Sequence, residues 1–82
     1  MKELFAIKHI TSQGYLQIEP EAGNYIVDFE DNITTFGTKS FAEWTISDGI
    51  YVEAHIDEGE SEELDSKEFV IVKLTIIKET EV

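Results

Sequence analysis

The side chains that could carry chemistry in this sequence are two histidines, five serines and a large excess of carboxylates. His9 and His55 each lie inside a run of strand-forming residues, and neither belongs to an HxH or HxxxH pair of the kind that binds zinc. The serines fall in expected turns and loops, so their spacing predicts no Ser–His–acid triad. Cysteine is absent and the glycines stand singly, which leaves no catalytic thiolate and no glycine-rich phosphate loop. We therefore expect a protein that is not an enzyme and that uses no metal and no cofactor.

The densest group of carboxylates is the segment 57–68, DEGESEELDSKE, which holds seven acids and one lysine. Its length invites comparison with the twelve-residue calcium loop of an EF-hand. Three of its acids match ligand positions of that loop, but Gly59 offers no side-chain oxygen and Glu62 stands where the sharp turn needs glycine. The sequence therefore predicts an acidic loop without a specific calcium site. Two roles stay open for it: a solvated connection that keeps the protein soluble, or a binding surface.

The overall charge restricts the kind of partner. Eighteen acidic residues face six lysines and no arginine, so the formal net charge is −12 at pH 7. Affinity for phosphate comes from Lys and Arg, and direct binding to nucleic acid or to an anionic membrane is therefore disfavoured. A basic protein is the favoured partner. The first residues lack the apolar core of a signal peptide and no run reaches the length of a membrane span, so we expect a cytoplasmic protein.

Alternation of apolar and polar residues predicts strands along most of the chain. The runs with this pattern cover residues 4–10, 15–19, 25–29 and 67–78. The last run is apolar on both faces, which indicates an interior strand of a sheet or one that closes a barrel. With 41% hydrophobic residues, the chain should fold as one all-β domain over residues 1–82. We expect a single small antiparallel sheet, arranged as a meander or as a compact barrel or sandwich of about five or six strands, with a frayed end at 79–82.

Residues 38–54 are compatible with two local structures. Ser40 and Glu43 have the spacing of a capping box, which predicts a short helical turn near 38–44. A β-hairpin with a three-residue loop at 47–49 would place Gly49 at the left-handed position that such loops need. Its cross-strand pairs would all be apolar and would share one face: Ile46 with Ile50, Trp44 with Val52, and Ala42 with Ala54. We favour the hairpin, with Trp44 at the centre of its buried face.

The hairpin would carry an acidic face on its other side. Glu43 would lie across from Glu53, although like charges directly opposite each other destabilise a sheet. Tyr51 would share this face, and an exposed tyrosine among carboxylates is typical of an interface hot spot. Together with the acidic loop, these residues form the predicted partner-binding surface. Its members are Glu43, Tyr51, Glu53, Asp57, Glu58, Glu60, Glu62, Glu63 and Asp65.

In size, charge and β content, the chain resembles the small, acidic, cysteine-free inhibitors of phages and mobile elements, such as anti-CRISPR and anti-restriction proteins and the uracil-glycosylase inhibitor. The resemblance rests on these overall properties and assigns no functional residue. It implies an inhibitor that occupies the nucleic-acid groove of a basic enzyme, such as a nuclease, in the manner of a nucleic-acid mimic. Two alternatives stay open: an immunity protein for a basic toxin, and a structural module that self-associates, for instance as a homodimer.

Overall fold

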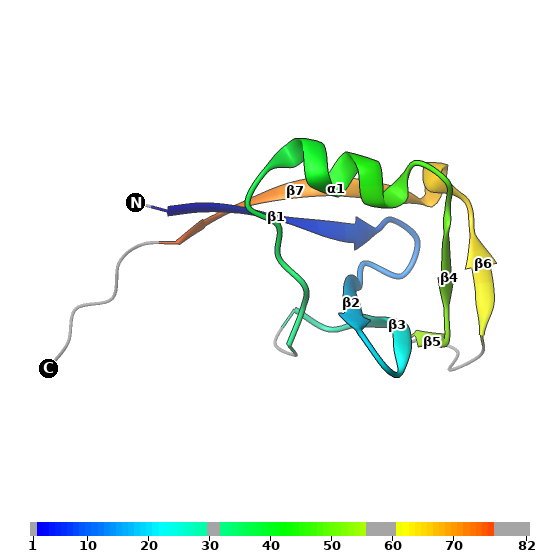
Figure 1. The fold of residues 1–82 in the computed structure, drawn as a ribbon. Helices are drawn as coiled ribbons and strands as arrows, with labels where there is room; N and C mark the ends of the chain where they lie inside the picture. Colours follow the sequence, from blue (N-terminus) through cyan, green and yellow to red (C-terminus); the bar gives the residue numbers. More distant parts are fainter. Residues whose placement is uncertain (1, 30–31, 56–60, 77–82) are drawn as a thin grey trace, which may run out of the picture.

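The computed structural model describes residues 2–29, 32–55 and 61–76. This part of the chain forms seven strands, one α-helix and one 3₁₀ turn (Figure 1). In chain order they are β1 (Lys2–His9), β2 (Tyr15–Glu19), β3 (Gly23–Val27), α1 (Lys39–Ile46), β4 (Ile50–Val52), β5 (Ala54–His55), β6 (Glu62–Leu64), η1 (Ser66–Glu68) and β7 (Phe69–Ile76).

Four antiparallel strands form the main sheet, in the order β3-β2-β1-β7, and the two residues of β5 extend it in parallel beside β3. The β2–β3 hairpin pairs five residues with five, from Tyr15 opposite Val27 to Glu19 opposite Gly23. β1 and β7 pair along all eight residues of each strand. Leu16 of β2 lies opposite Ile26 of β3 and both are buried, whereas β1 buries the adjacent residues Ala6 and Ile7 on its two faces.

The sheet bends sharply between β1 and β2, which pair only at Lys8 and Tyr15. The segment just before α1 fills the space that opens between the two strands. The Thr34 amide donates to the Leu16 carbonyl at 3.0 Å, and Phe36 exchanges two backbone hydrogen bonds with Phe5, at 2.9 and 2.7 Å. The backbone groups that the bend would expose are therefore paired, which a buried segment requires.

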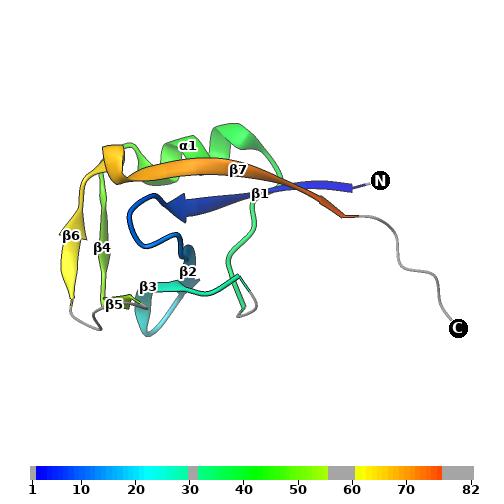
Figure 2. The same cartoon turned by 180° about the vertical axis from the view of Figure 1, so that it is seen from behind.

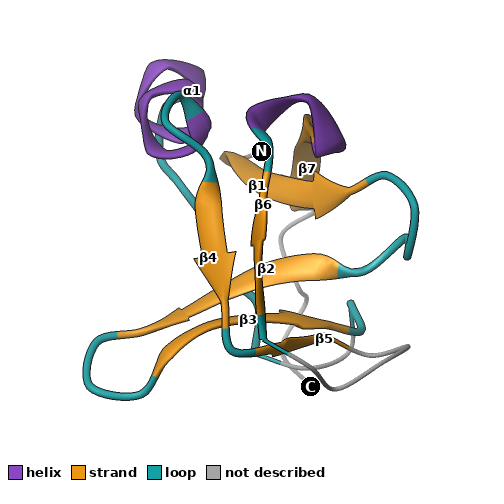
Figure 3. Ribbon diagram, turned by 90° about the vertical axis from the view of Figure 1, so that its right-hand side faces the viewer, coloured by secondary structure: helices purple, strands orange, loops and turns teal. Residues whose placement is uncertain are grey.

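A two-stranded ribbon of β4 and β6 stands beside this sheet and faces the viewer in Figure 3. We call it the β4–β6 ribbon. Ile50, Val52 and Leu64 point from it into the molecule and are buried. They join Ile7, Leu16 and Ile26 of the main sheet, together with Ala42 of α1, in one hydrophobic core. Burying such side chains is the main source of stability in a domain of this size.

The structure confirms the predicted fold class, a small all-β fold with a short helical turn near 38–44. The favoured hairpin over 42–54 is wrong, because residues 39–46 form α1 and β4 pairs with β6. The last strand neither lies inside the sheet nor closes a barrel, contrary to the prediction, since β7 lies at the edge of the sheet that the described residues form. The expected fraying at 79–82 lies outside the described residues.

Candidate functional site

Helix α1 forms where the sequence favoured a hairpin, and its caps explain why. Thr38 is the N-cap, and its hydroxyl oxygen accepts a hydrogen bond from the Phe41 amide at 3.2 Å. At the other end, the Gly49 amide donates to the Ile46 carbonyl at 3.1 Å. Gly49 does adopt the predicted left-handed conformation, with φ of 85°, but there it ends the helix rather than turning a hairpin.

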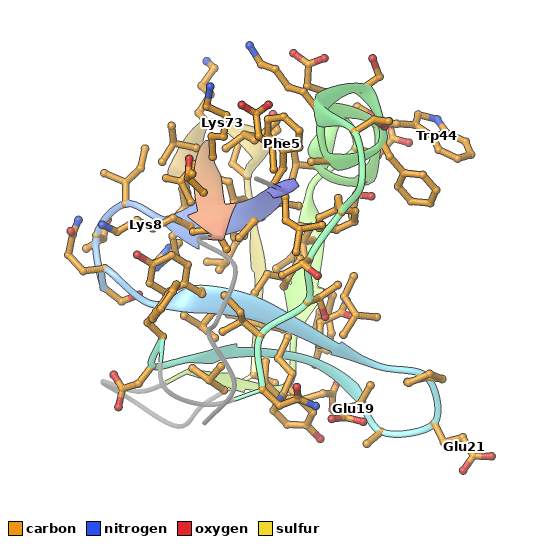
Figure 4. All side chains as sticks on the ribbon, turned by 90° about the vertical axis from the view of Figure 1, so that its left-hand side faces the viewer. Phe5, Lys8, Glu19, Glu21, Trp44 and Lys73 are labelled. Atoms are coloured by element: carbon orange, nitrogen blue, oxygen red, sulfur yellow. The ribbon has the colours of Figure 1, made fainter. Side chains whose placement is uncertain are left out.

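The burial of α1 follows from helical geometry. Ala42 and Ile46 lie one turn apart and face the core; Ala42 is fully buried and Ile46 packs against the core cluster. Each residue advances the helix by about 100°, so Trp44 points directly away from this buried side. Trp44 is 74% exposed and projects into solvent (Figure 4). The prediction that it fills a buried centre is wrong, because helical spacing sends it outward.

Three aromatic rings lead from the core to the surface along this side of the molecule. Phe36 is 7% exposed, Phe41 56% and Trp44 74%. The Phe36 and Phe41 ring centroids lie 5.7 Å apart, and the Phe41 and Trp44 centroids lie 6.2 Å apart in an edge-on arrangement. We call these three side chains the α1 aromatic face. Ring contacts of this geometry hold the outer two residues without burying them.

A shallow groove of about 370 Å³ lies beside the α1 aromatic face. Its lining is mostly apolar and comes from β2, from the segment before α1 and from α1 itself. The lining residues are Ile18, Thr34, Thr35, Phe36, Gly37 and Phe41. We call it the front groove. Apolar grooves with a few polar groups are typical binding sites.

Carboxylates lie on the elements that line the front groove but not in its lining. Glu43 is exposed on α1, on the opposite side of Trp44 from Phe41 by helical position. Glu19 and Glu21 lie at the end of the β2–β3 hairpin, which extends to the same side of the molecule as Trp44 (Figure 4). Lys8 and Lys73 lie on the other side in that view. The exposed aromatic rings of α1 and the carboxylates at the hairpin end therefore lie on the same side of the protein, while Glu43 faces away from the groove.

The members of the predicted binding surface that the structure describes lie on separate elements and not on one hairpin face. Glu43 lies on α1 and does not pair with Glu53, so the like-charge pair expected from the hairpin does not exist. Glu53 instead follows β4; its amide donates to the Asn24 carbonyl at 2.6 Å, and its side chain lies against Gly23. Tyr51 lies on the β4–β6 ribbon, 50% exposed and directly opposite Glu63. The structure thus brings Tyr51 together with a carboxylate, but with a different one.

The predicted acidic loop 57–68 is partly regular structure. Asp57, Glu58 and Glu60 lie outside the described residues. Glu62 and Glu63 belong to β6 and are exposed, and η1 follows them. Asp65 is the N-cap of η1, where it forms a reciprocal capping box with Glu68. Residues 62–68 therefore form a strand and a 3₁₀ turn, and are not an irregular loop.

Asp65 borders a second hollow, of about 380 Å³, between the end of α1 and the β4–β6 ribbon. Asp48 and Glu63 also line it. The hydrogen bond that the Lys67 backbone amide donates to Asp65, at 3.0 Å, lowers the pKa of this carboxyl below its ordinary value of 3.8. Within the described residues, no group of three or more His, Asp or Glu side chains is arranged to hold a metal ion.

His9 contacts a serine and a glutamate, and these contacts join two separate segments of the fold. His9 is buried, and its Nδ1 lies 2.7 Å from the Ser12 hydroxyl and accepts from the Ser12 amide at 3.3 Å. Its Nε2 lies 3.5 Å from a carboxylate oxygen of Glu68. Neither His9 nor Ser12 lines the front groove or the hollow at Asp65. The cluster ties the β1–β2 turn to η1.

Phe41 and Trp44 are the candidate functional residues that sequence reasoning missed. The signal that could have found them is the spacing of Ala42 and Ile46, which gives a helix one inward side and turns Trp44 outward. Within the described part of the chain, no helix has the length and apolar character to cross a membrane. Comparison of the chain with protein-family models, with curated proteins and with solved structures finds no match.

Proposed function

We propose that this protein is a binding inhibitor that covers the nucleic-acid groove of a basic enzyme. It would act without catalysis of its own, in the cytoplasm. The observation that carries the proposal is the α1 aromatic face, with Trp44 at 74% exposure in a chain whose net charge is −12. An exposed apolar patch with a polar border is typical of a protein interaction site.

The aromatic rings and the carboxylates would have different tasks in binding. Tryptophan is enriched among the residues that dominate binding energy when they are buried against a partner. Trp44 and Phe41 would supply this contact and would set the lifetime of the complex. Glu19, Glu21 and Glu43 would stay at the rim, where charges mainly raise the association rate. The net charge of −12 would add attraction over a longer range.

Charge complementarity favours an enzyme that handles nucleic acid. Such an enzyme carries a groove lined with Lys and Arg, which normally binds the phosphate backbone. A protein with 18 acids and six lysines would be attracted to that groove and not to the nucleic acid itself. Inhibition would follow because the two ligands compete for one surface.

The proposal can be tested by capture with matched variants. The immobilised chain is incubated with lysate of its source cell at low and moderate salt, as wild type, as the double variant Phe41→Ser/Trp44→Ser, and as Tyr51→Ser. Tyr51→Ser is the control, because it removes another exposed aromatic ring, 50% exposed, from the β4–β6 ribbon. We expect wild type and Tyr51→Ser to recover the same protein, and the double variant to lose it.

The recovered protein is then purified and assayed on its nucleic-acid substrate. We expect the chain to inhibit it, added duplex DNA or RNA to displace the chain, and affinity to fall as salt rises. A recovered protein that does not bind nucleic acid, or an enzyme whose activity stays unchanged at saturating inhibitor, would contradict the proposal. Equal recovery by wild type and both variants would show that the α1 aromatic face does not bind the partner.

A further inference from the structure

Strand β7 occupies the edge of the main sheet. Within the described residues, β1 is its only strand partner. In the view from behind, β7 runs across the near side of the molecule, and no described element lies in front of it (Figure 2). An edge strand of eight residues is long, and its unpaired backbone groups form a template for another strand.

The hydrogen bonds of β1 identify which groups of β7 point outward. Phe5 bonds to Phe36, and the His9 amide donates to the Gly14 carbonyl, so the odd-numbered residues of β1 point away from β7. In an antiparallel pair, two residues opposite each other both point inward or both point outward. The odd residues of β7 lie opposite these residues. The outward carbonyls therefore belong to Phe69, Ile71, Lys73 and Thr75. The outward amides belong to Ile71, Lys73 and Thr75, because the Phe69 amide already donates to the Ser66 carbonyl.

The side chains of β7 differ in charge from the rest of the protein. Residues 69–76 contain no acid, in a chain with 18 of them, and Lys73 is their one charged residue. Val70, Val72 and Leu74 point to the sheet face that α1 does not cover; Val70 is 43% exposed and the other two are half-buried. An apolar, acid-free edge explains why the strand has apolar residues on both faces without lying inside the sheet.

We propose that β7 pairs with β7 of a second copy of this chain, antiparallel and centred on Val72. A two-fold axis perpendicular to the sheet keeps each side chain on its own face, so the register must join residues of equal parity. Centring on Val72 places Val70 opposite Leu74 of the second copy. Ile71 then lies opposite Lys73 of the second copy, so the two lysines do not face each other.

This register also pairs most of the outward backbone groups. Ile71 with Lys73 becomes a hydrogen-bonded pair that exchanges two bonds, and the Thr75 amide donates to the Phe69 carbonyl of the second copy. With their symmetry mates they give roughly six new hydrogen bonds. Val72 meets its own copy in the closer, non-hydrogen-bonded type of pair. A two-fold contact of this kind uses both β7 edges at once, so it yields a dimer and not a fibre.

The net charge gives the dimer a distinctive response to salt. Two copies at −12 each repel one another. Salt screens this repulsion, while the strand pairing itself involves no acidic residue. Self-association should therefore tighten as salt rises, in contrast to the binding of a basic partner, which should weaken. This contrast separates the dimer from the proposed function, on which it does not depend.

The test compares Lys73→Pro with Lys73→Ala by light scattering after size exclusion, over a range of protein and salt concentrations. Proline removes the outward amide of residue 73 and places a ring at the edge, but leaves the hydrogen bonds to β1 intact. Alanine keeps the amide. Both variants lose the contact of 3.6 Å between Lys73 Nζ and Glu3, so their difference reports the backbone edge alone.

We expect wild type and Lys73→Ala to have twice the chain mass of 9.3 kDa and Lys73→Pro to be monomeric, with the far-UV circular dichroism of all three unchanged. The dimer fraction of wild type should rise with salt. A wild type that stays monomeric at high protein and salt concentration would overturn the proposal. A folded Lys73→Pro that remains dimeric would also overturn it, because association would then use another surface.

Discussion

The α1 aromatic face and the β4–β6 ribbon are both exposed, but they orient their apolar side chains in opposite directions. The ribbon turns Ile50, Val52 and Leu64 into the core and shows carboxylates and one tyrosine to solvent. Helix α1 sends only Ala42 and Ile46 inward and leaves Phe41 and Trp44 outside.

This difference shows that exposed aromatic area, and not the number of carboxylates, distinguishes the two surfaces. Carboxylates are spread over most of this protein, so their number does not locate an interaction site. Exposed aromatic area is confined to a few places, and desolvating such area is what gives a contact most of its strength. We therefore assign stability to the ribbon and partner binding to α1, and the following predictions test that division.

The largest effect should come from Leu64→Ala. Leu64 is 2% exposed and pairs with Ile50 across the ribbon. Removing its side chain should cost about 3 kcal/mol of unfolding free energy, through lost burial and a residual cavity. Urea unfolding followed by far-UV circular dichroism measures this. Glu63→Ala on the outward side of the same strand is the control and should change the unfolding free energy by less than about 0.5 kcal/mol.

Trp44→Ala should have the converse effect. We expect the affinity for the captured partner to fall about 30-fold, or about 2 kcal/mol, while unfolding free energy changes by less than about 0.5 kcal/mol. Isothermal titration with the purified partner measures the affinity. Tyr51→Ala should weaken binding only a few-fold. If Tyr51→Ala were the more damaging variant, the ribbon and not α1 would be the binding surface.

Gly49→Ala should destabilise the junction between α1 and the ribbon. Gly49 has φ of 85°, and an added Cβ would lie 3.0 Å from the Leu64 carbonyl oxygen. Alanine is strained in that conformation, so we expect a loss of about 1 kcal/mol in unfolding free energy. Gly37→Ala is the matched control, since no atom lies within 4 Å of its added Cβ. Equal midpoints for the two variants would show that the turn tolerates alanine.

The smallest effect concerns the pH dependence of the capping box. The pKa of Asp65 is lowered in the folded protein, so its carboxylate stabilises the fold above the ordinary pKa of 3.8. That contribution is lost as pH falls through the lower, folded-state pKa. Asp65→Asn keeps an oxygen acceptor but cannot titrate. The urea midpoint of wild type should exceed that of the variant near neutral pH, and the difference should shrink in acid. A difference that grows in acid would contradict this account.

The fold class could be predicted because it depends on local alternation. Tyr15–Glu19 alternates cleanly and forms β2 as expected. The helix was missed because Ile46, Trp44 and Ala42 fit a hairpin register as well as a helix. In the structure Thr38 caps the first turn of the helix. The free energy of such a cap, relative to that of the apolar cross-strand pairs of a hairpin, cannot be read from the sequence.

The candidate site was predictable only in its chemical character. The acidic surroundings follow from composition, and Tyr51 is exposed beside a carboxylate as expected. Which carboxylate it meets depends on the pairing of β4 with β6, across the residues between them, and such long-range pairing leaves no mark in local periodicity. The exposure of Trp44 could not be derived while residues 42–46 were assigned to a strand.

The pairing of β1 with β7 has a consequence for how the protein is made. Leu4 lies opposite Leu74 and Ala6 opposite Val72, so these partners are separated by most of the chain. Contacts between such distant residues slow folding. On a ribosome, β1 would emerge before β7, and the backbone groups of β1 that pair with β7 would stay unpaired until then. Chains whose synthesis stops before residue 69 should therefore be targets for chaperones and proteases, and the finished fold should form only after release of the last strand.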